Sequence, residues 1–456
     1  MERVYESVDP ATGEVLESFP IATDTELRDA LDRAESAFAV WHRQPLQDRA
    51  ARLTRVAELL DAQAGDLAEL MALEMGKRVA EGVAEAKKCA WGCRYYAENA
   101  ASFLKPEKKQ SDGSEAWIRY EPLGPLLAIM PWNFPFWQFF RFAAPALVAG
   151  NVTLLKHAPN TPRCARRIER LLLDAGLPDG AIRNLFLSNE QAARAIADPR
   201  IRGVTLTGST RAGKQVAATA GANLKTMVLE LGGSDPFIVF ADADIEKAIE
   251  GGVASRCLNN GQSCIAAKRF LVQAPVFDEF RDGLVERMRE RTMGNPRDPD
   301  VQLGPLARRD LRDRLAAQVA SSVTAGARAL CGGEVPDCDG FFYPATVLVD
   351  APPESPAACE ELFGPVATLF RFENDEDALA LANGTAYGLG ASLWTTDRER
   401  ADRLIPRIES GAVFVNGLVK SDPRLPFGGI KDSGFGRELG REGLLEFVNR
   451  KTVWIA

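Results

Sequence analysis

The sequence predicts an α/β protein with two doubly wound parallel-sheet lobes and a small antiparallel pair of strands. Short apolar runs alternate with helical patterns between residues 126 and 229, and a second alternation begins after residue 230. Such repeating strand and helix units form parallel sheets, because two parallel strands need a crossover connection. Apolar and polar residues alternate at 116–120, and the segment 450–456 is expected to pair with them as an antiparallel strand.

The N-terminal part is expected to form a hairpin followed by helices. Residues 4–20 contain two short turn signals, which are typical of a hairpin. From Asp24 onward, apolar residues recur at steps of three and four, which indicates a helix that Thr23 or Asp24 can cap. Two further helices are expected at 47–75 and 78–103.

The strands of the lobes are expected at the short apolar runs. In the first lobe these are residues 126–130, 152–156, 184–187 and 203–207. In the second lobe they are residues 237–240, 270–272, 366–370, 391–394 and 411–415. From these strands we expect a first domain formed by residues 1–112 and 126–229 and a second domain formed by residues 230–420. Residues 113–125 and 440–456 are expected to form a separate antiparallel part.

Length and composition limit the classes of function. The chain has 456 residues, of which 46% are hydrophobic, so it can form a large core in two or more domains. It has neither a run of about 18 apolar residues nor a basic N-terminal segment before an apolar one, so we expect a cytoplasmic protein without a membrane partner. A net charge of −8 without a basic stripe argues against nucleic acid, and an anionic substrate would need a local cation.

The cysteines and histidines narrow the possible chemistry. The eight cysteines show no zinc-ribbon spacing, and disulfides are not expected in the cytoplasm. With only His42 and His157, histidine-based metal sites and catalytic triads have few residues to draw on. We therefore expect no metal site and a carboxylate as the catalytic base.

One stretch has the features of a nucleophile with its base. Cys264 follows Gly261 and Gln262, which should break the preceding helix and place the thiol on a turn. Glu230 ends the apolar run 227–229, so its carboxylate is expected at a strand end, where α/β sheets bind ligands. Many free cysteines only pack in a core. A thiolate beside a carboxylate, in contrast, suits covalent acyl chemistry.

A second motif suits phosphate binding. Gly208 and Ser209 follow a strand and open a helix, whose N-terminus presents free N–H groups and a partial positive charge. A plain turn between strand and helix is the structural alternative. Gly208, Gly213 and Lys214 also approach the spacing of a nucleotide-triphosphate P-loop, but Gln215 stands where a P-loop needs Ser or Thr. A P-loop phosphotransferase is therefore only a remote alternative.

A third motif places an asparagine between prolines, in the run Pro131-Trp132-Asn133-Phe134-Pro135. An asparagine amide is a neutral donor that stabilises an oxyanion when it is held in place, and the prolines would restrict its motion. A turn or capping asparagine is the ordinary alternative.

These motifs resemble the aldehyde dehydrogenase superfamily, and the resemblance covers nearly the whole chain. The matching signatures are Glu230-Leu231-Gly232-Gly233, Gly261-Gln262-Ser263-Cys264, Trp132-Asn133-Phe134-Pro135 and Glu360-Glu361-Leu362-Phe363-Gly364-Pro365. The resemblance implies Cys264 as the nucleophile, Glu230 as the base, and Asn133 with the Cys264 N–H as the oxyanion hole. It also implies a Rossmann-like cofactor domain, a catalytic domain and an arm that joins a homodimer or homotetramer, although the arm strands equally suit an internal edge ribbon. Segments 415–417 and 426–438 also match signatures of the family, and the resemblance implies that they shape the wall of the active site without taking part in the chemistry.

The resemblance further implies NADP or NAD as the cofactor. The implied cofactor residues are Trp132, Lys156, Pro159, Gly208, Ser209, Leu231, Glu361 and Phe363. In the family the lysine matching Lys156 contacts the adenosine ribose, and a glutamate that disfavours a 2′-phosphate often stands three residues later. Here Pro159 occupies that position, and Lys156 can pair with the phosphate, so we expect NADP to be accepted without excluding NAD.

Substrate selection is predicted from the helix that follows Asn133. Gln138 and Arg141 lie three residues apart and face the same way, and an arginine there can grip a carboxylate with two hydrogen bonds or pair with a neighbouring acid. With Ser421, this segment resembles the short bacterial succinate-semialdehyde dehydrogenases, in which the matching Arg and Ser hold the substrate carboxylate. The expected reaction is oxidation of succinic semialdehyde to succinate through a thiohemiacetal and thioester on Cys264. A dehydrogenase for another small aldehyde or semialdehyde, such as glutaric semialdehyde, and a non-catalytic relative are the alternatives.

Overall fold

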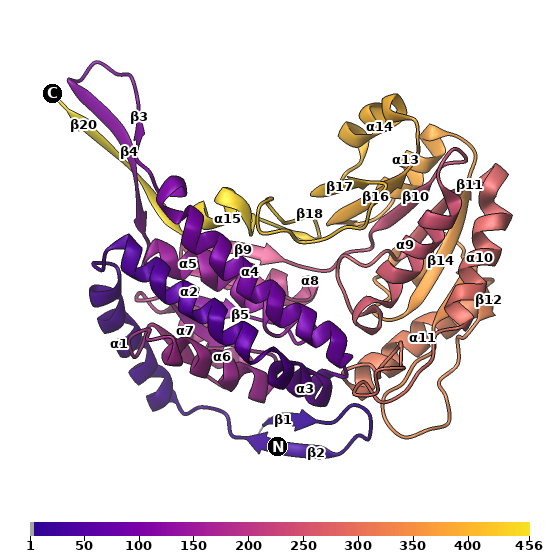
Figure 1. Cartoon of the computed structure of the whole chain (residues 1–456), viewed down its shortest axis with the longest axis horizontal. Helices are drawn as coiled ribbons and strands as arrows, with labels where there is room; N and C mark the ends of the chain where they lie inside the picture. Colours follow the sequence, from indigo (N-terminus) through magenta and orange to yellow (C-terminus); the bar gives the residue numbers. More distant parts are fainter. Residues whose placement is uncertain (1–3) are drawn as a thin grey trace.

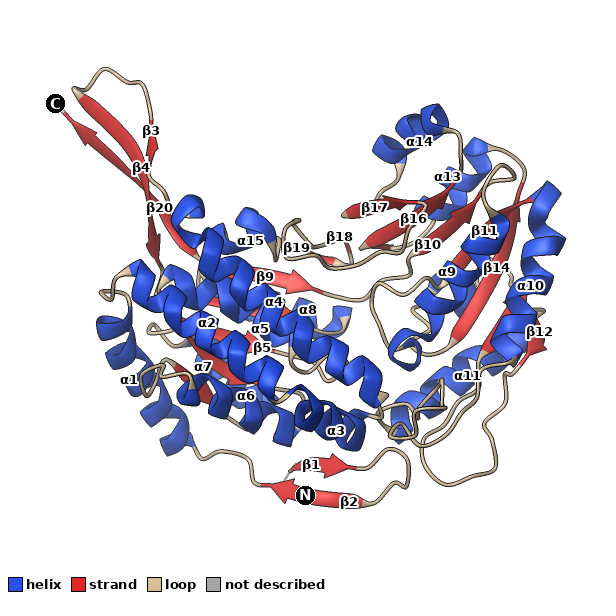
Figure 2. Ribbon diagram, viewed as in Figure 1, coloured by secondary structure: helices blue, strands red, loops and turns tan. Residues whose placement is uncertain are grey.

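The computed structural model describes residues 4–456 and contains two large sheets with helices packed around them (Figure 1). One sheet has six strands in the order β19-β9-β8-β5-β6-β7, and the other has seven in the order β12-β13-β14-β11-β10-β16-β17. Figure 2 shows both sheets surrounded by helices, with a smaller antiparallel sheet that projects from the body. The predicted class, α/β with two parallel-sheet lobes and an antiparallel arm, is confirmed.

The first sheet reverses its strand order at β5. Its strands are β5 (Pro125–Ile129), β6 (Val152–Lys156), β7 (Ile182–Asn184), β8 (Gly203–Thr207), β9 (Thr226–Glu230) and β19 (Gly434–Phe435). All are parallel except β19, which pairs antiparallel with β9. The chain runs outward through β6 and β7 and then returns to β8 on the other side of β5. Ligands bind α/β sheets outside the carboxyl ends of the strands at such a reversal.

Helices pack around the first sheet, and α1 to α4 precede it in the chain while α5 to α8 alternate with its strands. They are α1 (Asp24–Trp41), α2 (Leu46–Ala62), α3 (Ala64–Met75), α4 (Val79–Phe103), α5 (Trp137–Ala149), α6 (Pro162–Asp174), α7 (Asn189–Ala197) and α8 (Thr210–Ala222). Thr23 caps α1 through reciprocal hydrogen bonds with Glu26, as the capping prediction requires. The single helix expected at 47–75 is wrong, because the backbone leaves the helical conformation at Gln63. No helix among residues 4–456 combines the length and apolar character needed to span a bilayer.

The second sheet contains all five predicted strands and two more. Its strands are β10 (Pro236–Val239), β11 (Arg269–Gln273), β12 (Arg328–Cys331), β13 (Thr346–Val349), β14 (Val366–Phe372), β16 (Gly390–Trp394) and β17 (Ala412–Val415). Only β12 pairs antiparallel. Its helices are α9 (Ile245–Cys257), α10 (Phe277–Arg289), α11 (Arg309–Ala325), α12 (Pro356–Cys359), α13 (Asp375–Asn383) and α14 (Arg398–Leu404).

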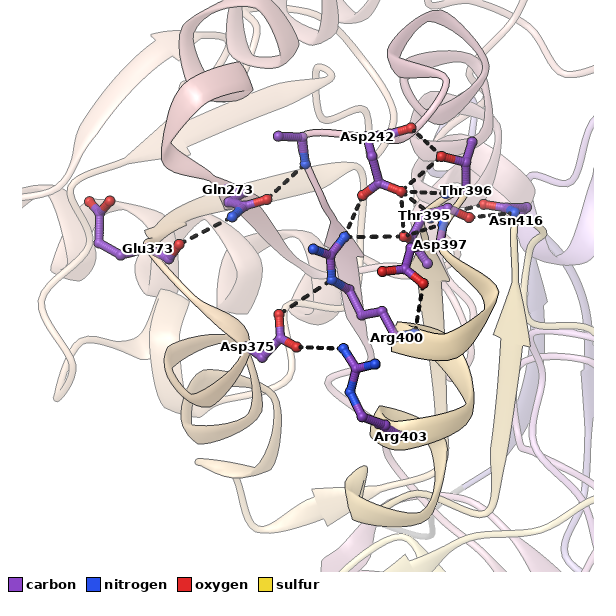
Figure 3. Close-up of polar contacts among 11 residues, drawn as sticks. Asp242, Gln273, Glu373, Asp375, Thr395, Thr396, Asp397, Arg400, Arg403 and Asn416 are labelled. Atoms are coloured by element: carbon purple, nitrogen blue, oxygen red, sulfur yellow. Dashed lines mark hydrogen bonds and ion pairs between the residues drawn. The ribbon is translucent and has the colours of Figure 1, made fainter.

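A polar network around Asp242 ties the carboxyl ends of β10 and β16 to α14 (Figure 3). Its carboxylate accepts hydrogen bonds from Thr395 Oγ1 at 2.7 Å and from the Thr396 N–H at 2.7 Å. Arg400 Nη1 donates to it at 2.6 Å. Burial tends to raise the pKa of Asp242, but the hydrogen bonds outweigh it and hold that pKa at about 2. The carboxylate therefore stays charged and stabilises this end of the sheet, opposite the end at which β11 begins.

Three small antiparallel sheets complete the fold among residues 4–456. The shortest pairs β15 (Tyr387–Gly388) with β18 (Ile430–Lys431). The predicted N-terminal hairpin is β1 (Tyr5–Val8) with β2 (Val15–Phe19). The predicted arm consists of β4 (Glu115–Pro122) and β20 (Val448–Ile455), with a short edge strand β3 (Glu107–Lys108). In Figure 1 this arm extends from the upper left of the body and ends at the C-terminus. Trp454 and Ile455 on the arm are 51% and 47% exposed.

Candidate active site

A cleft of about 690 Å³ brings together most of the residues that the sequence singled out. Its walls include Cys264 and Asn133 from the catalytic set and Gln138 from the substrate set. From the cofactor set they include Trp132, Gly208, Ser209, Leu231, Glu361 and Phe363. Five candidates are not part of these walls, namely Glu230, Arg141, Ser421, Lys156 and Pro159.

The two sheets contribute to the cleft through opposite strand ends. Trp132 and Asn133 follow the carboxyl end of β5, and Gly208 follows that of β8. The cleft therefore begins at the reversal point of the first sheet, where ligand binding is expected. In contrast, Cys264 precedes the amino end of β11 and Glu361 precedes that of β14. The cleft is thus assembled between the carboxyl edge of one sheet and the amino edge of the other.

The turn that carries Cys264 has a strained backbone. Asn259, Asn260 and Gly261 all have positive φ values, of 54°, 56° and 75°. A Cβ atom at position 261 would overlap the backbone of Gly364, so only glycine fits there. Non-glycine residues in this conformation are uncommon, and strain of this kind is often found at functional sites. The helix ends at Cys257, before the glycine, and the prediction that Cys264 lies on a turn is confirmed.

Buried side chains hold this turn in place. Asn260 Nδ2 donates to the carbonyl oxygens of Gly76 and Pro305, at 2.8 and 3.0 Å. Lys268 Nζ donates to the carbonyl oxygen of Cys264 at 2.7 Å and to that of Ser263 at 3.0 Å. These contacts satisfy the backbone from inside the protein. The thiol is thereby presented on a rigid support, although Lys268 was not recognised as functional from the sequence.

The thiol of Cys264 is half-buried and protonated at neutral pH. Burial raises its pKa to about 12, while the positive charges of Arg141 and Lys268 act in the opposite direction. A base is therefore needed to generate the thiolate. The backbone N–H of Cys264 has no hydrogen-bond acceptor recorded among residues 4–456, which leaves it free to donate to a ligand.

Asn133 is fixed by two hydrogen bonds to the same turn. Its side-chain Nδ2 donates to the backbone carbonyl oxygen of Gln262 at 3.0 Å. Its backbone carbonyl oxygen accepts a hydrogen bond from Asn259 Nδ2 at 2.7 Å. An amide group has two N–H donors, so one remains for a ligand. Because Asn133 is only 4% exposed, it needs little reorganisation to act as a preorganised donor.

Glu230 is the C-terminal residue of β9 and is almost completely buried, at 2% exposure. Neither carboxylate oxygen has a hydrogen-bond partner within residues 4–456. Burial raises its pKa well above the usual range; Arg141 works against this shift and the nearby Glu438 adds to it. A raised pKa is typical of general bases in active sites. With this pKa, the carboxyl group of Glu230 must lose its proton before it can accept one.

Arg141 lies between two carboxylates. It forms an ion pair with Glu438, and its Nη2 is 3.9 Å from Glu230 Oε2. The same nitrogen donates to Thr207 Oγ1 at 3.4 Å, and the guanidinium packs over the ring of Phe427. These contacts match the alternative that the sequence left open, an arginine paired with neighbouring acids. The role of Arg141 as the grip on a substrate carboxylate stays a prediction.

Ser421 lies beside a lysine that sequence reasoning missed. Lys88 Nζ donates to Ser421 Oγ at 2.8 Å, and Trp137 Nε1 donates to the same oxygen at 2.9 Å. Lys88 is on α4, far from Ser421 in the chain. The helical pattern of α4 gave no signal that one of its lysines would meet the C-terminal segment.

The cofactor candidates fit a dinucleotide. Thr210 and Arg211, in the first turn of α8, line the cleft, and their N–H groups have no acceptor recorded among residues 4–456. This is the arrangement that binds phosphate at a helix N-terminus. Lys214 instead points outward to an ion pair with Asp432 at 3.1 Å, with its side chain 67% exposed. It is therefore not placed as the phosphate-gripping lysine of a P-loop.

Aromatic and charged groups define the rest of the cofactor region. The Trp132 and Phe363 rings meet edge to face, with centroids 5.7 Å apart. Glu361 accepts a hydrogen bond from the Gly233 N–H at 3.1 Å. Lys156 ends β6 at the carboxyl edge of the first sheet and is buried, and burial lowers its pKa to about 8. No carboxylate lies within 4.0 Å of its amine among residues 4–456.

Comparisons with known proteins point to one family. Residues 1–453 match the model of the aldehyde dehydrogenase family. The chain is 50% identical over 450 residues to a probable succinate-semialdehyde dehydrogenase, NADP(+), of Synechocystis, with 99% of both chains covered. It is 49% identical to succinate-semialdehyde dehydrogenase, NADP(+), 1 of Mycobacterium tuberculosis, again over 99% of both. The crystal structure of succinic semialdehyde dehydrogenase from Streptococcus pyogenes in complex with NADP+ has a TM-score of 0.97, 38% identity and 99% coverage of both chains.

Proposed function

The chain belongs to the aldehyde dehydrogenase family, and from that we propose that it oxidises succinic semialdehyde to succinate, with NADP as an accepted cofactor. The observation that carries the proposal is the cleft, in which the Cys264 thiol and the Asn133 amide share one space with the phosphate-binding end of α8. The names of the similar proteins support the choice of substrate and cofactor.

The first half of the proposed mechanism forms a thiohemiacetal. The Cys264 thiol gives its proton to solvent, and the sulfur attacks the aldehyde carbon. The carbonyl oxygen becomes negative and accepts hydrogen bonds from Asn133 Nδ2 and the Cys264 N–H, both of which have a free donor. NADP, when bound, supplies the acceptor for the hydride that leaves this carbon.

The second half releases the acid. The resulting thioester is attacked by water, whose proton passes to Glu230, and the carbon–sulfur bond breaks. Glu230 then gives this proton to the leaving sulfur, which restores the thiol group and the carboxylate. Arg141 and Glu438 set the charge around Glu230 in this step. The tight support of the Cys264 turn keeps the sulfur in line with the reacting carbon throughout.

The cofactor residues are proposed from their chemistry. Gly208, Ser209 and the first turn of α8 suit the pyrophosphate, with Trp132 along the phosphates, and the Phe363 ring, which meets that of Trp132, suits the nicotinamide. Leu231 and Glu361 also line the cleft, and Glu361 is proposed to bind the nicotinamide ribose. Lys156, which has no acid partner within residues 4–456, is proposed to meet the adenosine ribose and its 2′-phosphate, beside Pro159.

The substitution Lys156→Ala tests the phosphate assignment. A charge-assisted hydrogen bond is lost, so we expect KM for NADP to rise by about 10- to 100-fold, with a smaller change for NAD. Initial rates with each cofactor measure this difference. Lys214→Ala is the matched control, because that lysine is exposed and paired with Asp432. Equal losses with NADP and NAD would show that Lys156 does not distinguish the two cofactors.

The substrate is tested by initial rates on a panel of aldehydes. We expect kcat/KM for succinic semialdehyde to exceed that for butanal, its neutral counterpart of the same chain length, by about 10- to 100-fold. Glutaric semialdehyde and hexanal complete the panel. If butanal or hexanal is oxidised as efficiently as the semialdehydes, the proposed substrate is wrong, although the family assignment would stand.

The organisation of the chain follows the same proposal. Residues 1–112 and 126–229 are proposed to bind the cofactor, 230–420 to supply the catalytic cysteine, and 113–125 with 440–456 to join subunits in a homodimer or homotetramer. The exposed Trp454 and Ile455 on the arm support a contact between subunits. All eight cysteines are free thiols, which supports the cytoplasm as the setting.

A further inference from the structure

Lys268 is a buried cation whose side chain folds back onto the turn that carries Cys264. It immediately precedes β11, and its side chain is 2% exposed. Its N–H donates to the Asp235 carbonyl oxygen at 3.1 Å, and its own carbonyl oxygen accepts from the Thr368 N–H at 3.1 Å. The backbone of Lys268 is therefore fixed by the second sheet, and its ammonium group reaches the turn from that support.

The ammonium group donates to three carbonyl oxygens of the turn. Its Nζ lies 3.0 Å from the oxygen of Ser263, 2.7 Å from that of Cys264 and 3.3 Å from that of Ala266. Three such bonds use all three N–H donors of an ammonium group, whereas a neutral amine has only two. Burial lowers the pKa of Lys268, but this set of acceptors favours the charged form.

The same ammonium group faces the carboxylate that is proposed to bind the nicotinamide ribose. Glu361 Oε1 lies 3.6 Å from Lys268 Nζ and accepts a hydrogen bond from the Gly233 N–H at 3.1 Å. The Glu361 side chain is 18% exposed and lines the cleft. No donor to its Oε2 is recorded among residues 4–456. One oxygen is thus held from inside the protein, and the other is free for a ligand.

Two glycines leave room for both groups to approach Lys268. A Cβ atom at Gly233 would lie 2.8 Å from the Cys264 carbonyl oxygen, and one at Gly232 would lie 2.5 Å from Glu361 Oε2. Both distances are shorter than van der Waals contact allows. A side chain at either position would therefore push the carboxylate or the turn away from the ammonium group.

Lys268 and Glu361 act on the thiol with opposite signs. Burial raises the pKa of the Cys264 thiol to about 12. The positive charges of Arg141 and Lys268 oppose this shift, while the negative charges of Glu361 and Glu230 add to it. The other charged groups that face Lys268 are Asp235 and Arg256. The charge of Lys268 therefore offsets that of Glu361 at the sulfur.

We propose that Lys268 is a positioning residue that couples the nucleophile to the carboxylate of Glu361, because one ammonium group holds the Cys264 turn and balances that carboxylate. The inference rests on the proposed function, in which Cys264 attacks the aldehyde and Glu361 binds the nicotinamide ribose. Lys268 is not part of the cleft wall and acts through these two residues. It fixes where the sulfur and the ribose-binding carboxylate lie relative to one another, which is the alignment that hydride transfer needs.

The charge of Lys268 is tested by the reactivity of the thiol, on the full chain without cofactor or aldehyde. Iodoacetamide alkylates the thiolate, so near pH 8, well below the thiol pKa of about 12, the rate constant is proportional to the thiolate fraction. Mass spectrometry of the peptide that contains Cys264 follows this site alone. We expect Lys268→Met to slow the alkylation by about 3- to 30-fold and Glu361→Gln to speed it by about 3- to 10-fold. Lys214→Met, at an exposed lysine paired with Asp432, is the matched control and should change the rate by less than about twofold.

The direction of the change separates this role from a purely structural one. If Lys268 only stiffened the turn, Lys268→Met would loosen it, expose the half-buried thiol and speed the alkylation. A Lys268→Met protein whose thiol reacts as fast as that of the wild type, or faster, would overturn the proposal. Should this variant fail to fold, Glu361→Gln decides, since a thiol no more reactive than that of the wild type would equally overturn it.

The coupling to Glu361 is tested by the binding of NADPH, followed by its fluorescence. We expect Lys268→Met and Glu361→Gln each to raise the dissociation constant by about 3- to 30-fold. The double variant should bind within about threefold of Glu361→Gln alone, because Lys268 acts through this carboxylate. Losses that multiply in the double variant would overturn the coupling. A wild-type protein that does not bind NADPH would overturn the proposed function instead, while the thiol test would still decide the role of Lys268.

Discussion

Replacing Cys264 by alanine is expected to abolish aldehyde oxidation, with kcat lowered by at least about 10⁴-fold. The substitution removes the sulfur that forms the thiohemiacetal, and no other cysteine lines the cleft within residues 4–456. Reduction of NADP by a saturating aldehyde measures the loss. The cofactor should still bind, because the helix N-terminus and the aromatic walls of the cleft are unchanged.

Cys338→Ala is the matched control for this experiment. Cys338 is exposed and lies on a surface loop, so its removal should leave kcat within about twofold of the wild-type value. If Cys264→Ala retained more than a few per cent of the wild-type rate, covalent catalysis through this sulfur would have to be abandoned.

Replacing Glu230 by glutamine is expected to slow turnover by about 10²- to 10⁴-fold while leaving a first burst of reduced cofactor. Glutamine keeps the shape of the side chain but cannot take a proton from water, so the thioester accumulates. Rapid mixing with excess aldehyde measures the amplitude of the burst and the rate that follows. A variant without a burst would show that Glu230 also acts before hydride transfer, as the base for the thiol.

The pH dependence of turnover also tests the role of Glu230 as the base. Burial raises the pKa of Glu230 well above its usual range, against the opposing charge of Arg141. Because the base is active only when it is ionised, wild-type kcat should still rise with pH above the range in which an ordinary carboxylate titrates. Glu230→Gln should lose this rise. A parallel rise in wild type and variant would assign the titration to another group.

Much of the fold could be predicted from local patterns. The strands β6 and β8 are short apolar runs with helical patterns on both sides, and they lie where they were expected. The strand expected at 184–187 is wrong, because β7 ends at Asn184. The following residues turn to the N-terminal hairpin, where the Leu187 carbonyl accepts a hydrogen bond from the Tyr5 hydroxyl at 2.8 Å. That contact joins residues far apart in the chain and leaves no local signal.

Some side chains of the candidate site could be predicted from the sequence, but the contacts of others could not. The thiol of Cys264 and the carboxylate of Glu230 stand beside glycines at the ends of regular elements, and this pattern is visible in the sequence. The ion pair of Arg141 with Glu438 is not visible, since the two residues are almost three hundred positions apart. The contact of Lys88 with Ser421 is equally non-local. A charged residue on a helix face has many possible partners, and only packing selects among them.

By itself, the sequence determined the α/β class, the cysteine on a turn, the acid at a strand end and the helix that begins after Ser209, because each depends on neighbours within a few residues. Only the tertiary structure decided which cation remains without an acid partner and which is neutralised. The physical reason is that the state of a buried charge depends on the carboxylates that the fold brings within a few ångströms, and those come from distant parts of the chain.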